Sequence, residues 1–321
     1  MDVIFIVNPA ARNGRSLDRW ESFCKQIGFP YEAVMTKGPG HAAAVARGLA
    51  AKADRGPLLL IAFGGDGTVH EVIRGAAGYP EVQIGSVGAG SGNDFGRGYL
   101  SFRTAEEIEA AGRKDSGSFD LGTAGMPGSS KPAVFVNSAG IGFDAVISMQ
   151  VNRSRTKRLF NRFGAGKLIY TFFIVRTLFT FRPFSLTVDA DGQRRKFDRV
   201  WLAAVSNQPY YGGGMMISPG SDPADGELEL TVIHGLNRLK LLLVFGTVFT
   251  GSHTRFKEVH RQSGGAFRLT ADRRMPVHTD GEGAGLAEPG RPIPFEVRRA
   301  AWRLAGPTRN RKVRDKHEGT P

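Results

Sequence analysis

The sequence is poor in cysteine, in long apolar segments and in leader-like features at its start. Cys24 is the single cysteine among 321 residues, so no disulfide can form within the chain. The first residues lack a basic stretch followed by an apolar one. The longest nearly apolar run, residues 168–175, is much shorter than the ~20 residues that a membrane-spanning helix needs. We therefore expect a cytoplasmic protein that does not cross a bilayer.

Acidic residues are also scarce relative to basic ones. The chain has 43 Lys and Arg against 30 Asp and Glu, a formal net charge of +13. Residues 145–188 carry eight basic residues and no acidic one, and the tail adds further positive charge. Such an excess favours partners that carry phosphate, such as nucleotides, nucleic acids or anionic lipids. No zinc, helix-turn-helix or RNA-binding signature accompanies the charge, so we expect no nucleic-acid partner.

The first 120 or so residues alternate strand-like apolar runs with helical patterns. The strand-like runs cover residues 3–8, 31–36, 58–63 and 83–87, and the helical patterns cover 17–27, 41–51 and 68–77. Alternation of this kind is typical of βαβ units and of a parallel sheet covered on both faces. The sequence therefore predicts an α/β fold class, with a Rossmann-like parallel-sheet domain over residues 1–122.

The pattern changes after about residue 119. Strand-like segments such as FSLTVDA, RVWLAAVSN and LELTVIH are separated by Gly, Pro and Asp turns, which predicts a C-terminal, antiparallel, β-rich and sandwich-like domain over residues 123–305. Within it, the basic, aromatic-rich insertion 152–184 is predicted to be helical. The polar, basic tail 306–321 is predicted to be disordered. Two domains also agree with the chain length.

A glycine-rich motif, Gly64-Gly65-Asp66-Gly67-Thr68, lies between a predicted strand and a predicted helix. Glycine lets backbone N–H groups approach phosphate oxygens closely, and a helix N-terminus adds partial positive charge. Asp66 would repel phosphate directly, so its carboxylate is a candidate to hold Mg²⁺ or a water in the shell of the ion. The alternative is an ordinary glycine-rich turn in which Thr68 caps the helix.

A second glycine-rich loop, residues 88–96, follows the next strand and contains Ser91, Asn93 and Asp94. Asn8-Pro9 and Thr36 also end predicted strands. Ligands bind outside the carboxyl ends of the strands of an open parallel sheet, so we expect these residues to face one nucleotide crevice. The chain has neither GxxxxGK[ST] nor a strand-linked GxGxxG with a downstream ribose acid, which argues against a P-loop and against an ordinary dinucleotide fold.

Eight motifs follow one another along residues 1–305: NPAARNGRS, TKGPGHAAAVAR, GGDGTVHEV, GSGNDFGR, FDLG, NSAGIGFDA, DPADGELEL and TDGE. In order and approximate spacing they resemble the diacylglycerol kinase catalytic family, and most closely its soluble bacterial lipid-kinase branch. The fold of that branch is shared with NAD kinases and sphingosine kinases. Three positions depart from the family pattern: Ser91 replaces the usual Thr, His70 the usual Asn and Glu229 the usual Asp.

The resemblance implies a Mg²⁺-dependent kinase with ATP as phosphoryl donor. ATP would be surrounded by Asn8, Pro9, Thr36, Gly64, Gly65, Asp66, Gly67, Thr68, Glu71, Ser91 and Asn93. The catalytic Mg²⁺ and its waters would be organised by Asp66, Asp94 and Asp120. A second, structural Mg²⁺ would be held by the loop carboxylates of Asp222 and Asp225 and by a backbone carbonyl at Glu227. Acids three residues apart in a Pro/Gly turn can converge on one cation, although an Asp-rich turn between strands explains them equally.

Transfer to a lipid hydroxyl needs a carboxylate that accepts the hydroxyl proton. The family places this catalytic base in Asp280-Gly281-Glu282, and the sequence leaves the role divided between Asp280 and Glu282. Without the resemblance, the same three residues would be interpreted as a solvated turn.

The resemblance thus implies a lipid kinase with catalysis between its two domains, most simply one that converts diacylglycerol to phosphatidic acid in phospholipid biosynthesis. The alternatives are a kinase of the same fold that acts on a sphingoid base, another lipid alcohol or NAD, and a non-catalytic membrane-binding regulator. The GSGNDF and DGE motifs follow the lipid branch and disfavour NAD. The basic insertion has the composition of an interfacial helix, so we expect peripheral association with an anionic membrane. An ordinary helix with a solvated basic face is the alternative, and a homodimer is left open.

Overall fold

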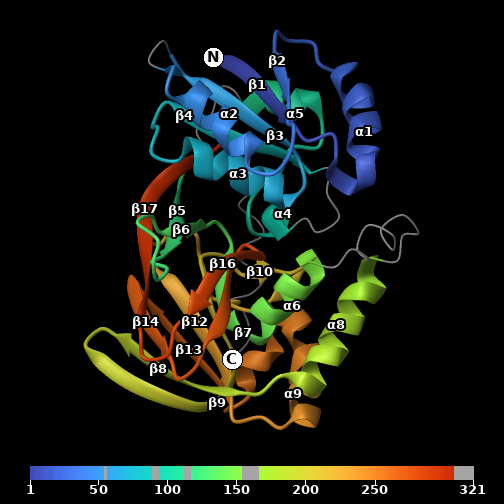
Figure 1. Cartoon of the computed structure of the whole chain (residues 1–321). Coiled ribbons are helices and arrows are strands. Elements are labelled where there is room, and N and C mark those ends of the chain that lie inside the picture. The colour runs from blue at the N-terminus through green and yellow to red at the C-terminus, as the bar shows by residue number, and fades with distance from the viewer. Residues whose placement is uncertain (54–55, 89–93, 112–116, 154–165, 307–321) are drawn as a thin grey trace, which may run out of the picture. The chain divides into compact units, whose positions relative to one another are not determined.

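The structure, a computed structural model, describes residues 1–53, 56–88, 94–111, 117–153 and 166–306 (Figure 1). The tail that is predicted to be disordered therefore lies almost entirely outside the described residues. The chain forms two compact units. Unit 1 comprises Met1–Gly90, Tyr99–Ser118 and Trp302–Pro321, and unit 2 comprises Ser91–Gly98 and Phe119–Ala301. The sequence predicts simple domain boundaries at residues 122 and 305. In the structure each unit is made of separate segments of chain, since Ser91–Gly98 belongs to unit 2 and the C-terminal segment from Trp302 belongs to unit 1.

Unit 1 contains a parallel sheet in the order β4-β3-β1-β2. Its strands are β1 (Asp2–Val7), β2 (Glu32–Met35), β3 (Leu58–Gly64) and β4 (Val82–Gly88). The end of β17 (Ile293–Leu304) pairs in parallel with β4. All seven residues of β3 are buried, as expected for a central strand of a sheet that is covered on both faces.

Helices pack against this sheet around aromatic side chains. They are α1 (Arg15–Cys24), preceded by the 3-10 helix η1 (Ala11–Gly14), and then α2 (His41–Ala50), α3 (Asp66–Ala76) and α5 (Ala105–Ala111). The ring of Trp20 in α1 lies 5.1 Å from that of Phe5 in β1 and 5.2 Å from that of Phe63 in β3, measured between centroids. This packing fixes α1 and the ends of β1 and β3 relative to one another.

Unit 2 is built mainly from antiparallel strands around one long strand, β9 (Gln193–Ser206). The first half of β9 pairs with β8 (Phe184–Ala190), and its second half pairs with both β7 (Ser138–Gly142) and β12 (Leu228–His234). Because β9 changes partners along its length, it joins strand groups that pack over one apolar core. The predicted fold class, a parallel α/β part followed by an antiparallel β-rich part, is confirmed.

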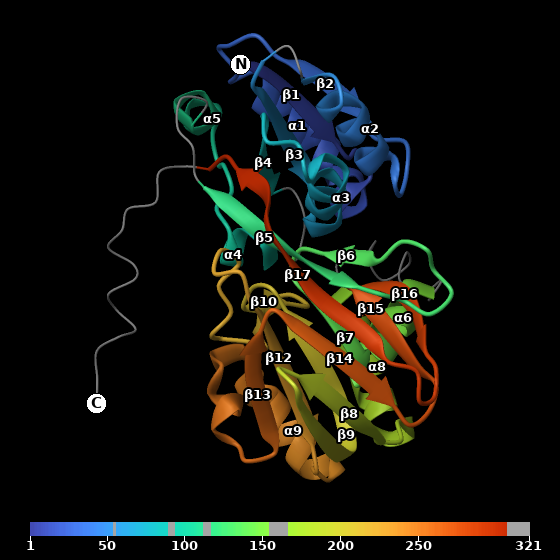
Figure 2. The ribbon, with the colours of Figure 1, turned by 90° about the vertical axis from the view of Figure 1, so that its left-hand side faces the viewer.

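Most of the remaining strands of unit 2 extend these groups. The pairs β8–β14 and β14–β17 lengthen one side, as Figure 2 shows, and β7–β15–β16 lengthen another. The bounds of these strands are β14 (Ala266–Ala271), β15 (Met275–Thr279) and β16 (Glu282–Ala287). Strand β13 (Val259–Gly264) pairs with β12, and β5 (Ser118–Ala124) pairs with β17 and with β6 (Ala133–Phe135). Strands β10 (Tyr210–Tyr211) and β11 (Met215–Met216) form a separate two-stranded sheet.

The helices of unit 2 are α4 (Asp94–Gly98), α6 (Phe143–Arg153), α8 (Gly166–Thr180) and α9 (Arg238–Thr247), with the 3-10 helices η3 (Val248–Thr250) and η4 (Ser252–Arg255). Phe143 of α6 and Phe181 after α8 pack against Trp201, which anchors both segments to β9. The described part of the basic insertion is helical up to Thr180. Helix α9 was not predicted, because its leucines occupy its buried and exposed sides alike and give no helical period.

Candidate functional site

The carboxyl ends of β1, β2 and β3 carry the predicted nucleotide residues of unit 1. The backbone N–H of Asn8 donates to the carbonyl of Phe63 at 2.9 Å, and that of Thr36 donates to the carbonyl of Val7 at 2.8 Å. The Asn8 side-chain amide donates to the hydroxyl of Thr68 at 3.0 Å. Asn8, Thr36 and the Gly64–Thr68 motif therefore lie at one edge of the sheet, where a parallel sheet binds its ligands.

The glycine-rich motif forms the N-terminus of α3. Gly65 is the N-cap in an extended conformation, and the backbone N–H of Thr68 donates to its carbonyl at 2.9 Å. A Cβ atom on Gly64 would lie 2.5 Å from the Thr68 hydroxyl, so packing alone requires this glycine. A Cβ atom on Gly67 would meet nothing within 4 Å, and Gly67 is exposed. Gly67 thus borders open space beside a helix N-terminus, which suits a phosphate group.

Glu71 has a structural partner that the sequence did not reveal. Its carboxylate accepts the backbone N–H of Gly40 at 2.7 Å and that of Ala42 at 3.1 Å. Gly40 is the N-cap of α2, so Glu71 satisfies N–H groups that have no partner within that helix. We interpret Glu71 as a residue that joins α3 to α2. The predicted nucleotide residues Ser91 and Asn93 lie outside the described residues.

Arg19 is a candidate phosphate-binding residue that sequence reasoning missed. Its guanidinium donates to the carbonyl of Gly88, the last residue of β4, so it lies at the same carboxyl edge of the sheet. A guanidinium there can hydrogen-bond phosphate oxygens in a fixed, planar geometry. The sequence does not identify Arg19, because it lies in helix α1 outside the motifs, where an arginine is typical of any exposed helix face.

Asp94 and Asp120 are buried acids of unit 2, with 6% and 3% of their surfaces exposed. The carboxylate of Asp94 accepts the backbone N–H of Gly213 at 2.7 Å. The two oxygens of Asp120 accept the N–H groups of Gly226 and Ala300, each at 2.7 Å. Asp120 therefore joins the loop of the predicted second magnesium site to β17. Asp66, the third predicted acid of the catalytic Mg²⁺, belongs to unit 1.

The loop 222–227 holds the acids of the predicted structural cation site. Asp222 accepts the N–H of Ala224 at 3.1 Å, and Asp225 accepts that of Glu227 at 2.9 Å. The pKa of Asp225 is raised, mainly by partial burial and further by repulsion from Asp222, Glu227 and Asp120. This crowded negative charge fits a cation. Among the described residues, however, no three acidic, His or Cys side chains stand together in positions that could hold a metal ion.

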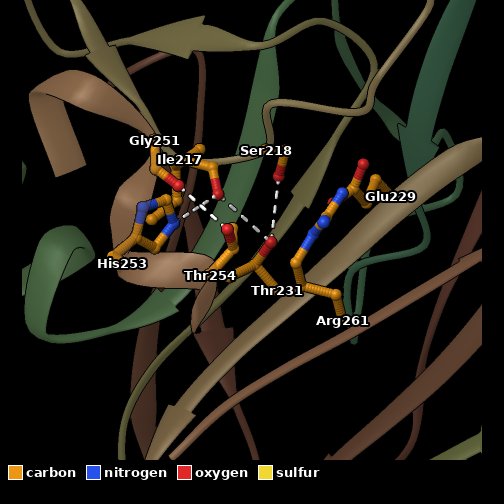
Figure 3. Close-up of polar contacts among 8 residues, drawn as sticks. All are labelled: Ile217, Ser218, Glu229, Thr231, Gly251, His253, Thr254 and Arg261. Atoms are coloured by element: carbon orange, nitrogen blue, oxygen red, sulfur yellow. Dashed lines mark hydrogen bonds and ion pairs between the residues drawn. The ribbon is translucent and has the colours of Figure 1, made fainter. Parts of the chain in front are cut away.

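A partly buried set of polar contacts fixes Ile217 and Ser218, which precede this loop, to the core of unit 2. Its members are Ile217, Ser218, Glu229, Thr231, Gly251, His253, Thr254 and Arg261 (Figure 3). The Nε2 atom of His253 lies 3.0 Å from the carbonyl oxygen of Ile217, and burial lowers the pKa of His253. Glu229, only 3% exposed, accepts from the Nε atom of Arg261 at 2.5 Å. Glu229, which stands where the family usually has Asp, is therefore bonded to Arg261.

Asp280 and Gly281 are the two central residues of the tight hairpin turn between β15 and β16. Both have positive φ, 50° and 81°, as a type I′ turn requires, and Thr279 pairs with Glu282 across the turn. The Asp280 carboxylate accepts three backbone N–H groups, from residues 136, 137 and 138, at 2.9, 2.8 and 3.2 Å. Glu282, the first residue of β16, is exposed. The two candidate bases therefore occupy different environments.

His278 and Asp144 form a buried pair behind this turn. The Nδ1 atom of His278 accepts the N–H of Gly281 at 3.2 Å, so its Nε2 atom carries the proton that it donates to Asp144 at 3.0 Å. The Asn152 side chain donates to the carbonyl of Gly281 at 2.9 Å, and the ring of Tyr211 is stacked on His278. These contacts hold the turn in place. Sequence reasoning missed the pair, whose members are 134 residues apart.

The predicted acids of unit 2 belong to one connected set of contacts. Tyr211 and Gly213 lie in the β10–β11 segment, which links Asp94 to the hairpin turn through His278. The side chain of Asn207 donates to the carbonyls of Asp120 and Val136, both at 3.0 Å. The structure thus links Asp94, Asp120, the DGE turn and the loop 222–227 within unit 2.

Two family models together match most of the chain. The diacylglycerol kinase catalytic domain matches residues 2–124, and the YegS C-terminal NAD kinase beta sandwich-like domain matches residues 137–304. The Bacillus subtilis protein named "Putative lipid kinase YtlR" is 30% identical over 87% of this chain and 92% of its own length. A diacylglycerol kinase of Mycobacterium tuberculosis (strain ATCC 25618 / H37Rv) is 28% identical over 78% of this chain and 76% of its own.

Solved structures share the fold. The crystal structure of a "putative diacylglycerol kinase" from Bacillus anthracis superposes with a TM-score of 0.70 over 95% of this chain and 97% of that chain, at 22% identity. The family models and relatives define a lipid kinase-like enzyme, whose residues 137–304 match an NAD kinase β-sandwich-like domain. The chain belongs to the diacylglycerol kinase catalytic-domain family and is a lipid kinase-like enzyme of its YegS-like branch. The family resemblance of the sequence is confirmed.

Proposed function

We propose that this enzyme transfers the γ-phosphoryl group of ATP to a lipid hydroxyl, with diacylglycerol as the first candidate acceptor and phosphatidic acid as the product. The observation that carries the proposal is the DGE turn, which presents one exposed carboxylate on a turn that is fixed by buried partners. Relatives named as diacylglycerol kinases support the choice of acceptor.

We assign the role of general base to Glu282 and a positioning role to Asp280. The Asp280 carboxylate is already engaged by three backbone donors, so it fixes the turn to the β6–β7 connection. Glu282 would accept the proton of the acceptor hydroxyl as its oxygen attacks the γ-phosphorus, and ADP would leave with the bridging oxygen. A carboxylate on a fixed turn costs little reorganisation when the reaction begins.

The nucleotide would bind at the N-terminus of α3 in unit 1. The exposed Gly67 and the helix N–H groups would bind its phosphates, and Asn8 and Thr36 lie at the same sheet edge. Asp66, Asp94 and Asp120 are the proposed acids for the catalytic Mg²⁺, which would neutralise charge on the transferred phosphoryl group. The carboxylates of Asp222 and Asp225, together with the backbone carbonyl of Glu227, would hold a second cation.

A direct test supplies radiolabelled ATP and Mg²⁺ with separate acceptors: diacylglycerol, a sphingoid base, a polyprenol and NAD. Lipids are presented in neutral mixed micelles, so the assay does not depend on vesicle binding. We expect label in diacylglycerol, with turnover about 10²-fold lower in Glu282→Gln and ATP affinity unchanged. The exposed Glu296 of β17 provides the matched control Glu296→Gln, which should retain wild-type turnover. ATP binding without transfer to any acceptor would favour a non-catalytic regulator instead.

A further inference from the structure

Helix α8 exposes apolar side chains on the side that faces away from the core. Phe172, Val175 and Phe179 are 60%, 44% and 67% exposed, and their spacing places them on one face of the helix. Thr177 and Leu178 are buried on the other face. A surface helix of a globular protein normally presents polar residues to water, so this arrangement requires an explanation.

Helix α9 shows the same arrangement. Leu239, Leu242 and Leu243 are 72%, 48% and 66% exposed, whereas Leu241 and Val244 are buried in the core of unit 2. Phe249, in the 3-10 helix that follows α9, is 52% exposed. Scattered exposed leucines are common in proteins, but several within one helix are not.

The two exposed stripes belong to one surface. The guanidinium of Arg238, the first residue of α9, donates to the carbonyls of Leu178 and Phe179 at 3.0 and 3.4 Å. Figure 1 shows α9 beside the C-terminal part of α8. We name the exposed side chains together the α8–α9 apolar face; they are Phe172, Val175, Phe179, Leu239, Leu242, Leu243 and Phe249.

Positive charge predominates around the α8–α9 apolar face, and the acid that contacts α9, Glu258, forms an ion pair with Lys240 at 2.6 Å. Neither residues 145–188 nor residues 230–257, the segments that contain the two helices, include an acid. Exposed basic side chains flank the face at Arg176, Arg182 and Arg238, and a further pair, Arg255 and Lys257, follows α9. Apolar side chains with a basic border are the pattern of a segment that lies in the interface of an anionic bilayer.

We infer that the α8–α9 apolar face docks this enzyme on anionic lipid membranes by shallow insertion of its Phe and Leu side chains. None of the described helices is long and apolar enough to cross a bilayer, which agrees with binding at the surface. A second copy of the chain is the less suitable occupant, because a symmetric pair would bring the basic borders together. The inference adds a docking surface to the proposed function, and its test uses no catalysis.

The experiment measures sedimentation of the full chain with phosphatidylcholine vesicles, with and without one third phosphatidylglycerol, in the absence of ATP. Wild type should bind the anionic vesicles, more weakly at high salt. The triple variant Phe179→Ser, Leu239→Ser, Leu243→Ser should bind at least about 10-fold more weakly. The matched control changes two exposed residues of unit 1, Leu17→Ser and Met35→Ser, and should bind as wild type.

A second variant and two further measurements keep the result unambiguous. Arg176→Glu with Arg182→Glu should weaken binding to anionic vesicles and leave binding to neutral vesicles unchanged, which tests the charge without altering the apolar side chains. Thermal unfolding checks that each variant is folded. Equal vesicle binding by wild type and both variants would overturn the inference. The inference would also be overturned if the wild-type protein did not bind vesicles but sedimented as a dimer, and if the triple variant sedimented as a monomer. Loss of phosphoryl transfer in neutral micelles, by contrast, would count against the proposed function alone.

Discussion

At the scale of single residues, the hydrogen-bond partners of the acidic side chains distinguish two roles. Some acids bind backbone N–H groups and hold the backbone in place, and others remain exposed. Glu71, Asp120 and Asp280 each accept at least two backbone N–H groups. Glu282 is exposed. In the sequence these acids look alike, because a motif shows which residue type is present and not which partner it has. The distinction between Asp280 and Glu282 therefore needed three-dimensional contacts.

Gly67 allows a sharp test of the nucleotide site. A Cβ atom at Gly67 meets nothing within 4 Å, so Gly67→Val should fold normally while its side chain occupies the space beside the helix N-terminus. We expect ATP affinity to fall by at least about 10-fold, since the phosphate can no longer approach the backbone N–H groups. Isothermal titration calorimetry with a non-hydrolysable ATP analogue measures the change.

The matched control for this glycine is Gly48→Val. Gly48 is exposed in α2 of the same unit, and a Cβ atom there also meets nothing within 4 Å. It should retain wild-type affinity. Unchanged affinity in a folded Gly67→Val protein would remove the basis for a phosphate site at α3.

The buried pair behind the DGE turn predicts an effect on turnover without contact to substrate. His278→Gln or Asp144→Asn should let the turn shift, and misplacement of Glu282 should lower kcat by about 10-fold. The KM for ATP should stay within about two-fold of wild type, since no nucleotide residue changes. Loss of folded protein would also lower the apparent kcat without changing KM, so turnover is expressed per folded protein, as measured by thermal unfolding. When His278→Gln or Asp144→Asn is combined with Glu282→Gln, kcat should fall no further than in Glu282→Gln alone. Additive losses of kcat in the double variants would contradict the positioning role.

At the scale of elements, the sequence predicts what depends on local pattern. Each predicted strand of unit 1 agrees with the observed one within about two residues, because buried parallel strands are short apolar runs between turn residues. Asp-Gly between two strand-like runs is itself a strong signal for the β15–β16 hairpin. The pairing of His278 with Asp144 and the capping of α2 by Glu71 depend on tertiary contacts, which no local pattern encodes.

The loop 222–227 should respond to a divalent cation. Partial burial, and further repulsion from the neighbouring acids, raise the pKa of Asp225, so a bound Mg²⁺ would offset that repulsion and stabilise unit 2. We expect Mg²⁺ to raise the Tm of the wild-type protein by about 3 °C and to raise that of Asp225→Asn by less. Differential scanning calorimetry with Mg²⁺ or with chelator measures both. The control Asp272→Asn, at an exposed residue outside the loop, should respond as wild type, and an equal response in Asp225→Asn would rule out this cation site.

At the scale of the whole molecule, the two units divide the chemistry between them. The parallel sheet of unit 1 gathers the predicted phosphate-binding residues at one edge, as such sheets do for many ligands. Unit 2 carries the DGE turn, the acids joined to it and the α8–α9 apolar face. Since unit 2 also contains the largest apolar core, its stability decides whether the proposed base and the docking surface persist together.

That stability should depend on pH below neutrality. Burial lowers the pKa values of His253, His234 and His260, all in unit 2, so these side chains stay uncharged when folded at a pH where the unfolded chain binds protons. Their contribution is fully present above the unfolded value near 6.5 and is lost as the pH falls through the lower folded values. His253, which is fully buried, adds a slope of up to about 1.4 kcal/mol per pH unit to the unfolding free energy in that window, and the partly exposed His234 and His260 add less. His253→Gln can still donate to the carbonyl of Ile217 but cannot titrate, so it should reduce the slope between pH 5 and 6.5. Calorimetry at a series of pH values measures this slope, and an unaltered slope in the variant would show that the acid sensitivity arises from other groups.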